Sequence, residues 1–251
     1  MALVDSLSRV EARDGGFPMK CVIMQPTFFP WAGYFNLASH ADVFVFLDDV
    51  QLEKQSWQTR NRILLQGKPV WISVPVLHRS VRQTIGETEV CDQYKWRGKL
   101  LRQLEQGYAK HPYSAQAIEV PGTLPHIGST SLADINIALL REFCGRLGLA
   151  PKFARSSELG IAGERSERLI RICERFGCDE YLSPAGAADY LAADRFVDQT
   201  SIGLTFQRYV PMPYGQPRVG EFVSHLSIID IVANLGWQAA AQYVRTSLPE
   251  A

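Results

Sequence analysis

Residues 20–50 contain two short apolar runs on either side of a helical segment, and this arrangement restricts the chain to folds with a parallel sheet. The first run, KCVIMQP, covers Lys20–Pro26, and the proline at its end is typical of a strand that stops there. The second run, DVFVFLDDV, covers Asp42–Val50 and is apolar enough for a strand buried on both faces. Between them, WAGYFNLASHA (Trp31–Ala41) places its apolar residues on one helical face. The three segments together predict a βαβ unit.

The rest of the chain continues the alternation of strands and helices, with a helical stretch in the middle. Further strands are expected in the segments KPVWISVPV, KFARSSEL, DEYLSP and GLTFQRYV, and helices at 92–112, 131–151 and 163–177. The segment SHLSIIDIVANLG predicts a closing helix with Ser224 as its N-cap and Gly236 as its C-cap. We therefore expect an α/β fold, in which a Rossmann-like, mostly parallel sheet carries a helical insertion at about residues 92–150 and a C-terminal helix.

Composition excludes several classes of protein. The chain has 251 residues with 26 Lys+Arg and 26 Asp+Glu, so its formal net charge is zero, which argues against a protein that coats nucleic acid. No run approaches the roughly 18 consecutive apolar residues of a membrane helix, so we expect no membrane insertion. The five cysteines form no C-x-x-C pair and the five histidines form no ligand pair. We therefore expect no metal site and a reducing, cytoplasmic location.

The expected domain organisation is simple. Residues 1–18 mix acids and bases without an apolar core, so they do not resemble a signal peptide and are expected to form a flexible N-terminal extension. This makes Met19 a candidate natural start. The chain shows no repeat and no low-complexity linker, so residues 19–251 are expected to form a single α/β domain.

The segment MQPTFFPWAGYF, directly after the first strand, is the first candidate part of a functional site. In open α/β sheets, ligands gather at the carboxyl ends of the strands. Gln25 is a polar residue at the tip of an apolar strand, where we expect it to orient a ligand carbonyl. Phe29, Trp31 and Tyr34 provide rings that stack on a base or a sugar, unless they fill the core. Gly33 lies near a helix start, which presents free N–H groups to an anion.

The segment LDDVQLEKQSWQTRNRI, after the second strand, combines both signs of charge. Asp48 and Asp49 stand at the strand end and are candidates to bind a metal, a ribose hydroxyl or a substrate ammonium group. Arg60 and Arg62 carry planar forks that suit phosphate or carboxylate, with Asn61 between them. The alternative is a solvated loop with incidental ion pairs. The position directly after a buried strand favours a polar, substrate-sized site.

Weaker candidates lie elsewhere in the chain. Ser183 ends a strand in YLSPAGAADYL, and Gly186 opens the following helix, where small residues let a backbone approach a phosphate. A tight packing corner explains this segment equally well. Lys95 precedes the apolar row of the first middle helix and is placed to face a cleft. His225, at the start of the closing helix, is close enough to reach a site, although a capping role is the simpler interpretation.

Several segments, taken in order, resemble the WbqC-like protein family. They are IMQPTFFPWAGYF, DVFVFLDDVQ, WQTRNRI, SSELG followed by ERL, YLSPAGAADYL and LSIIDIVANLG, and they span residues 19–236. The recurring blocks of the family fall on Gln25, Pro26, Pro30, Gly33, Tyr34, Asp48, Asp49, Arg60, Asn61, Arg62, Ser183, Gly186 and Tyr190. The chain has SPAG where the glycine-richer SGPGG is common, which argues against a phosphate cradle there. WbqC-like proteins are encoded among bacterial O-antigen and related surface-polysaccharide genes, so the resemblance implies a role in glycan assembly.

Three hypotheses of function remain open. The first is a transferase of bacterial glycan or amino-sugar modification, which forms an amide by acyl or aminoacyl transfer, with Asp48 or Asp49 accepting the proton of the amine. Its partners are a small-molecule or nucleotide-sugar substrate, whose phosphates bind Arg60 and Arg62, and a nucleotide or carrier-bound acyl donor. The second is nucleotidyl or adenylyl transfer, in which the two acids bind magnesium. The third is a non-catalytic module that scaffolds polysaccharide assembly.

Overall fold

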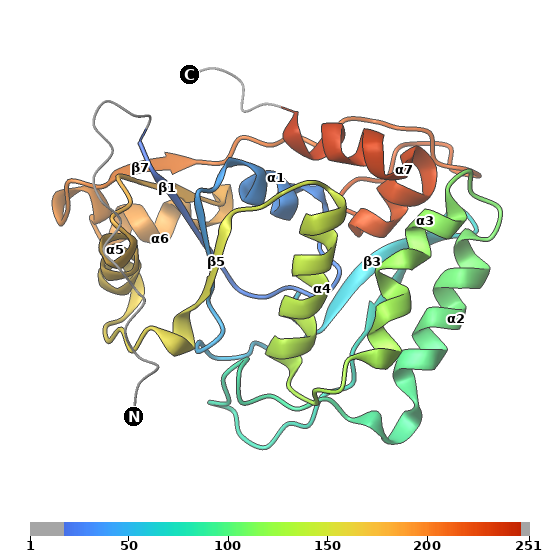
Figure 1. Ribbon diagram of the computed structural model, residues 1–251, viewed down its shortest axis with the longest axis horizontal. Coiled ribbons are helices and arrows are strands. Elements are labelled where there is room, and N and C mark those ends of the chain that lie inside the picture. Colours follow the sequence, from blue (N-terminus) through green and yellow to red (C-terminus); the bar gives the residue numbers. More distant parts are fainter. Residues whose placement is uncertain (1–17, 247–251) are drawn as a thin grey trace, which may run out of the picture.

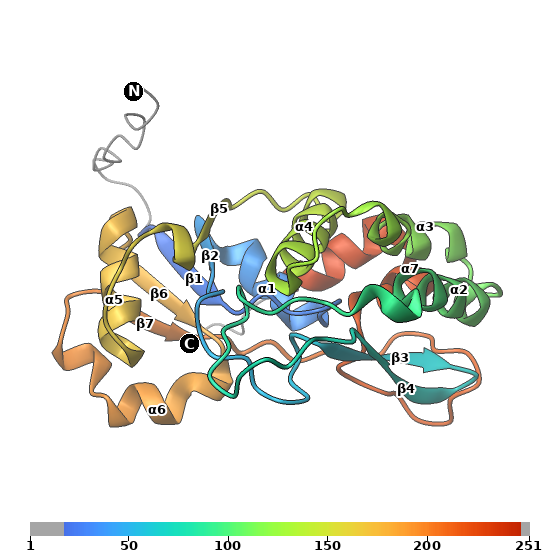
Figure 2. The same ribbon diagram turned by 90° about the horizontal axis from the view of Figure 1, so that it is seen from below.

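Five parallel strands form the central sheet, in the spatial order β5-β2-β1-β6-β7 (Figures 1 and 2). The strands are β1 Lys20–Met24, β2 Val43–Phe46, β5 Lys152–Arg155, β6 Glu180–Ser183 and β7 Gly203–Phe206. The computed structural model describes residues 18–246, so the expected flexible extension lies, except for its last residue, outside the described residues. A parallel sheet combined with helices confirms the predicted α/β, Rossmann-like class.

The strand order reverses beside β1. The chain moves outward from β1 to β2 and β5, and it then returns to lay β6 and β7 on the other side of β1. This is the doubly wound order. The connections after β1 and β6 turn in opposite directions and leave a crevice beyond the carboxyl ends of these two strands, which is where ligands bind in such sheets.

Helices cover the sheet and extend beyond it (Figure 2). The α-helices are α1 Ala32–His40, α2 Trp96–Tyr108, α3 Ser114–Glu119, α4 Leu132–Arg146, α5 Arg165–Phe176, α6 Ala188–Ala193 and α7 Ile228–Arg245. Short 3-10 helices lie at Asp92–Tyr94, Pro121–His126, Ser156–Glu158, Ala185–Ala187 and Phe196–Asp198. Within residues 18–246, none of the helices combines the length and apolarity that crossing a membrane requires.

The alternation of side chains along the strands separates two hydrophobic cores. Ile23 and Val45 point into the core that includes residues of α5 and α6. Val22 and Phe44 point into the larger core, which includes residues of α1, α4 and α7. Both faces of the sheet are therefore covered, and this explains why the first two strands are apolar along nearly their whole length.

A two-stranded antiparallel hairpin, separate from the main sheet, follows β2. Its strands are β3 (Arg60–Leu65) and β4 (Lys68–Ser73). Gln66 and Gly67 join them with φ values of 52° and 78°, the pattern of a type I′ turn. The strand expected at Lys68–Val76 is thus one half of this hairpin. In Figure 2 the hairpin and α2 lie at the opposite end of the molecule from α5 and α6.

The closing helix differs from the prediction at its start. α7 begins at Ile228, and its N-cap is Ser227, whose hydroxyl accepts a backbone hydrogen bond, rather than Ser224. At Gly236 the backbone leaves the helical conformation (φ 75°, ψ 169°), so the predicted end coincides with a break, after which a second helical stretch continues to Arg245. Buried residues beyond Gly236 continue the apolar face, so packing against the core stabilises the second helical stretch.

Candidate functional site

A cleft of about 640 Å³ opens beyond the carboxyl ends of β1 and β6, and we call it the switch-point cleft. Among the described residues, its walls hold aromatic rings and side-chain amides but no aspartate, glutamate, lysine or arginine. The aromatic residues are Trp31, Tyr34, Trp57, Tyr181 and Tyr190, and the amides are Gln25, Gln58 and Asn61. An uncharged, ring-lined cleft of this size suits a polar ring such as a sugar better than an ion.

Hydrogen bonds between amides from distant parts of the chain position Gln25. Gln58 donates to the side-chain oxygen of Gln25. Asn136 of α4 donates to the carbonyl oxygens of Pro26 and Gln58, at 2.9 Å each. Asn61 donates to a carbonyl oxygen of the loop after β1 at 3.1 Å. Gln25 and Asn61 line the cleft, as the sequence predicts for a site at the strand ends. Gln58 and Asn136 were not predicted, because isolated amide residues form no recognisable sequence pattern.

Trp31 forms one wall of the cleft, and Gly33 makes room for its ring. A Cβ atom at Gly33 would lie 2.1 Å from an indole carbon of Trp31, so a side chain cannot fit beneath the ring. Tyr34 is buried beside them, and its hydroxyl donates to the carbonyl oxygen of Gln25 at 3.1 Å. Burial raises the pKa of Tyr34. Trp31 and Tyr34 thus line the cleft, whereas Gly33 seats Trp31 and is not a lining residue.

Phe29 belongs to the hydrophobic core and does not take its expected place in the site. Its side chain is 1% exposed and packs on Phe28 and Phe143, with ring centroids 4.2 and 5.9 Å away. Its φ of 42° turns the chain sharply after the two phenylalanines. The aromatic residues of this segment therefore separate, with Phe29 in the core and Trp31 in the cleft.

Arg60 and Arg62 lie on the hairpin beside the cleft, on the face that carries Trp71. Their guanidinium carbons are 4.3 and 5.9 Å from the ring centroid of Trp71. The ring centroid of Trp71 is 5.6 Å from that of the cleft residue Trp57. Trp71 is 46% exposed and Trp57 is 48% exposed. Each guanidinium makes one long hydrogen bond of 3.4 Å through an Nη atom, and the Nε of each is buried without a partner among the described residues. We call Arg60, Arg62, Trp57 and Trp71 the arginine–tryptophan rim; it combines weakly hydrogen-bonded guanidinium groups with exposed rings.

His225 lines the switch-point cleft from the segment before α7. Its φ of 58° is left-handed, which is uncommon for a residue with a side chain. Its Nδ1 lies 2.8 Å from the Ser224 hydroxyl oxygen. Partial burial and the positive charge of Arg62 lower the pKa of His225 from its usual 6.5, so the neutral imidazole, which can accept a proton, predominates at pH 7. The capping role suggested by the sequence belongs to Ser227 instead.

Asp48 and Asp49 are engaged in ion pairs outside the cleft, unlike their expected catalytic placement. Asp48 is fully buried, and the Nε and Nη2 atoms of Arg155 donate to its Oδ2 at 2.9 and 2.6 Å. Burial alone would raise the pKa of Asp48, but hydrogen bonds from Arg155 and Ser157 outweigh burial and lower the pKa. Asp49 pairs with Arg168 of α5. Neither carboxylate lines the cleft, because each turns toward an arginine from β5 or α5.

The remaining predicted residues divide between the cleft and other places. Gly186 and Tyr190 line the cleft; burial raises the pKa of Tyr190, and a Cβ atom at Gly186 would meet no atom within 4 Å. Ser183 is buried at the end of β6, where its hydroxyl donates to a backbone carbonyl at 3.4 Å. Lys95 is the exposed N-cap residue of α2, beside a separate hollow. Within the described residues, no group of three or more His, Cys, Asp or Glu side chains is placed to hold a metal ion.

Comparison with known proteins links this geometry to a family. The model of the WbqC-like protein family matches residues 25–242. The uncharacterized protein Rv1507c of Mycobacterium tuberculosis is 31% identical over 227 residues, which cover 88% of this chain and 95% of that protein. No solved structure matches the chain at a significant level. The matched region contains Gln25, His225 and the arginine–tryptophan rim, and so nearly all of the switch-point cleft.

Proposed function

The chain belongs to the WbqC-like protein family, and on this premise we propose that it is a transferase of bacterial glycan modification, which forms an amide by moving an acyl or aminoacyl group onto a nucleotide-linked amino sugar. The observation that carries the proposal is the junction between an uncharged, ring-lined cleft and the arginine–tryptophan rim. Such neighbouring environments suit a ligand with a neutral ring at one end and phosphates at the other. The reaction fits the assembly of O-antigen and related surface polysaccharides.

The sugar ring is assigned to the switch-point cleft. The rings of Trp31 and Tyr190 line the cleft with apolar surface, against which the C–H face of a pyranose packs. The amide of Gln25 is oriented through its oxygen by Gln58, which leaves the Nε2–H donors for a hydroxyl or carbonyl oxygen of the ligand. The cleft therefore combines stacking with directional hydrogen bonds, as sites for small polar molecules do.

The phosphates and the base are assigned to the arginine–tryptophan rim. Arginine forks bind phosphate oxygens in pairs, and the guanidinium groups of Arg60 and Arg62 each make one long hydrogen bond, through an Nη atom, among the described residues. The exposed indoles of Trp57 and Trp71 provide faces on which a base stacks. A nucleotide at the rim would direct its attached sugar into the cleft, because Trp57 belongs to both.

His225 is the residue assigned to proton transfer. The neutral amine of the sugar attacks the carbonyl carbon of an activated acyl donor, such as a thioester. The new C–N bond forms, and the bond from the carbonyl carbon to the leaving group breaks, with its electron pair departing on that group. The proton released by nitrogen passes to His225 Nε2, whose lone pair is free when Nδ1–H donates to Ser224.

Calorimetry with a UDP-linked amino sugar, and with the same molecule lacking the amine, tests the binding part of the proposal. The wild-type protein is expected to bind both. Trp57→Ala and Arg62→Gln should each weaken binding by about tenfold or more, because one removes a stacking face and the other a charged donor. Lys54→Gln removes an exposed charge near the same loop and serves as the control. Failure of either sugar nucleotide to bind overturns the proposal.

Mass spectrometry after incubation with acyl thioesters tests the transfer step. With the wild-type protein, the amine-bearing sugar nucleotide should gain the mass of the acyl group, and the sugar nucleotide without the amine should keep its mass. His225→Asn should bind the sugar nucleotide normally and form product far more slowly, since it lacks a proton acceptor. Binding without turnover across a panel of acyl and aminoacyl thioesters would instead support the non-catalytic binding module.

A further inference from the structure

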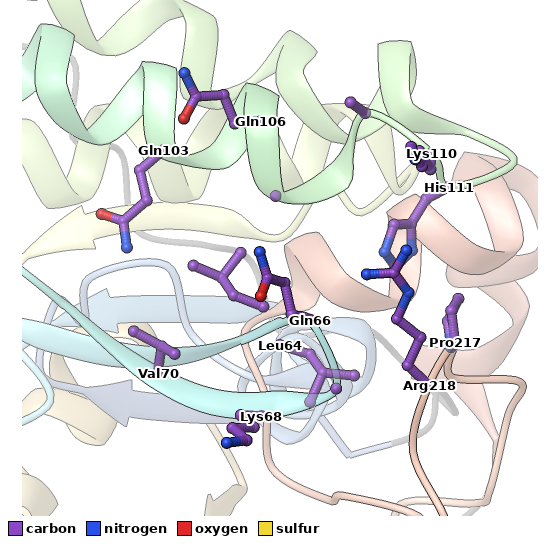
Figure 3. Close-up of a pocket in the computed structure, with 14 residues that line it drawn as sticks. Leu64, Gln66, Lys68, Val70, Gln103, Gln106, Lys110, His111, Pro217 and Arg218 are labelled. Atoms are coloured by element: carbon purple, nitrogen blue, oxygen red, sulfur yellow. The ribbon is translucent and has the colours of Figure 1, made fainter.

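A second hollow of about 640 Å³ lies between the tip of the β3–β4 hairpin and the C-terminal half of α2, and we call it the hairpin pocket. Figure 3 shows Gln103 of α2 on one side and Leu64 and Gln66 of the hairpin on the other. Gly67 at the hairpin tip is six residues from Asn61 in the switch-point cleft, or about 20 Å of extended chain. The hairpin pocket is therefore a separate place and not an extension of the cleft.

The lining of the hairpin pocket is positively charged. Lys68, Lys110 and Arg218 line it together with His111, and its described lining residues include no aspartate or glutamate. The whole chain has equal numbers of basic and acidic residues, so this excess is local. In Figure 3 the side chain of Arg218 extends toward the ring of His111 on the facing wall. Cations that face one hollow repel one another, and an anion bound in that hollow reduces the repulsion.

The other lining residues indicate what kind of anion fits. Gln66, Gln103 and Gln106 add neutral N–H donors to the charged ones. Leu65 and Val70 contribute apolar surface from one face of the hairpin. A bare phosphate ion would fill a small part of the hollow, whereas its size lies within the range of about 300–1,000 Å³ found for small-molecule sites. The pocket therefore suits an anionic group that carries an organic part.

Close backbone approaches hold the walls of the pocket in place. A Cβ atom at Gly67 would lie 2.3 Å from the carbonyl oxygen of Arg218, so the hairpin turn packs directly on the main chain there. Arg218 itself has a φ of 65°, which the packed turn maintains. A Cβ atom at Gly107 would lie 2.1 Å from a methyl carbon of Leu65, so α2 and the hairpin also touch. The position of the pocket is therefore set by packing.

One buried carboxylate anchors both basic walls. Asp230 of α7 is fully buried and accepts hydrogen bonds from the hydroxyls of Tyr108 at 3.1 Å and Tyr214 at 2.7 Å. Tyr108 ends α2 just before His111, and Tyr214 lies in the segment that leads to Arg218. The two walls thus share one internal attachment, which keeps their cations facing the same hollow.

We propose that the hairpin pocket binds a small organic phosphate. The phosphate lies among Lys68, Lys110 and Arg218, and the organic part packs against Leu65 and Val70. This second ligand site goes beyond the proposed transferase activity and does not depend on it, since it shares none of the lining residues of the switch-point cleft.

NMR titration of the full chain with phenyl phosphate, and with phenol as its uncharged counterpart, tests the proposal. Phenyl phosphate should bind saturably and shift the amide signals of Gly67 and Gly107, while phenol should not. Lys68→Gln/Arg218→Gln should weaken binding by about tenfold or more, because two charged donors are lost. The matched control, Arg82→Gln/Lys99→Gln, removes two exposed charges outside the pocket and should leave the affinity within about twofold.

Two kinds of result overturn the proposal: a failure of the expected binding behaviour, and binding at the other site. One is the absence of saturable binding, or binding that Lys68→Gln/Arg218→Gln retains in full while its amide spectrum shows a folded protein. The other is a set of shifts confined to the indole N–H signals of Trp31 and Trp57, which would assign the phosphate to the switch-point cleft. That second result would leave the proposed function intact, so the hairpin-pocket proposal can be overturned without overturning the proposed transferase activity.

Discussion

His225 packs against Trp31 with ring centroids 4.4 Å apart and ring planes inclined by 36°, although the two residues come from opposite ends of the chain. Backbone contacts hold this pair together: Trp31 forms a β-bridge with Ser227, and the Ile228 amide donates to the carbonyl oxygen of Pro30 at 2.8 Å. The loop after β1 and the start of α7 are thus joined by their main chains. This junction places an imidazole against an aromatic wall of the switch-point cleft.

We predict that Arg62→Gln raises the pKa of His225. Partial burial and the charge of Arg62 both lower that pKa, so removing the charge should return it part of the way toward 6.5 while burial keeps it below that value. NMR titration of the imidazole signals measures the change, and Arg79→Gln, an exposed change elsewhere, should have no effect. If His225 accepts the proton in catalysis, the acidic limb of the activity profile should move upward with its pKa. An unchanged pKa in Arg62→Gln would contradict the electrostatic coupling.

Gly33→Ala is predicted to displace Trp31 from the cleft wall. The new Cβ would lie 2.1 Å from the indole, so the ring must move, at a cost of about 1–3 kcal/mol in the free energy of unfolding. Gly186→Ala provides a matched control, because it also adds a methyl group to a glycine beside the cleft yet meets no atom within 4 Å. Urea unfolding and tryptophan fluorescence measure both variants. Equal behaviour of the two would show that the indole does not need the space above Gly33.

The sequence predicts the sheet and the position of the cleft because both depend on local patterns. Apolar runs mark β1 and β2, and ligand sites lie at the ends of parallel strands. Gln25, Trp31 and Tyr34 immediately follow β1, so a rule about strand ends is enough to bring them to the cleft. Tyr190 reaches the cleft in the same way from the segment after β6.

The same rule fails for residues whose surroundings are set by distant parts of the chain. Asp48 also follows a strand, but it turns away from the cleft because Arg155, 107 residues later, binds its carboxylate. No local pattern indicates that pairing. His225 enters the cleft only because the segment before α7 packs against Trp31, and Asn136 supports Gln25 from a helix of the middle region. Long-range partners therefore decide which polar residues face a ligand.

The buried pair of Asp48 and Arg155 leads to a prediction about pH. Asp48→Asn should lower the free energy of unfolding at pH 7 by about 2–3 kcal/mol, less than the 3–5 typical of a broken buried pair, because Arg155 keeps Asp134 as a partner. The pKa of Asp48 is lowered in the folded protein, so its stabilising effect is complete above the unfolded value of about 3.9 and is lost as the pH falls through the folded value. Urea unfolding from pH 7 to pH 3 should therefore show the wild-type and variant curves converging in acid. Asp189→Asn, an exposed control, should follow the wild type throughout, and a constant gap for Asp48→Asn would refute the assignment.

Tyr214→Phe tests the hydrogen bond to Asp230 that anchors the hairpin pocket. The pH dependence of its stability should be opposite to that of Asp48→Asn. Burial raises the pKa of Asp230, while hydrogen bonds from Tyr214 and Tyr108 act against that rise. Losing the Tyr214 hydroxyl should raise the pKa further and cost about 1–3 kcal/mol in the free energy of unfolding, because a buried carboxylate loses a donor.

A carboxyl group whose pKa is raised on folding stabilises the folded state fully below its unfolded pKa of about 3.9. This stabilisation is lost as the pH rises through the folded pKa. The stability gap between wild type and Tyr214→Phe should therefore widen from pH 4 to pH 8. Tyr113→Phe, which alters a more exposed tyrosine, is the control for removal of a hydroxyl group. A gap that narrows with rising pH would mean that Asp230 does not depend on Tyr214 to carry its charge.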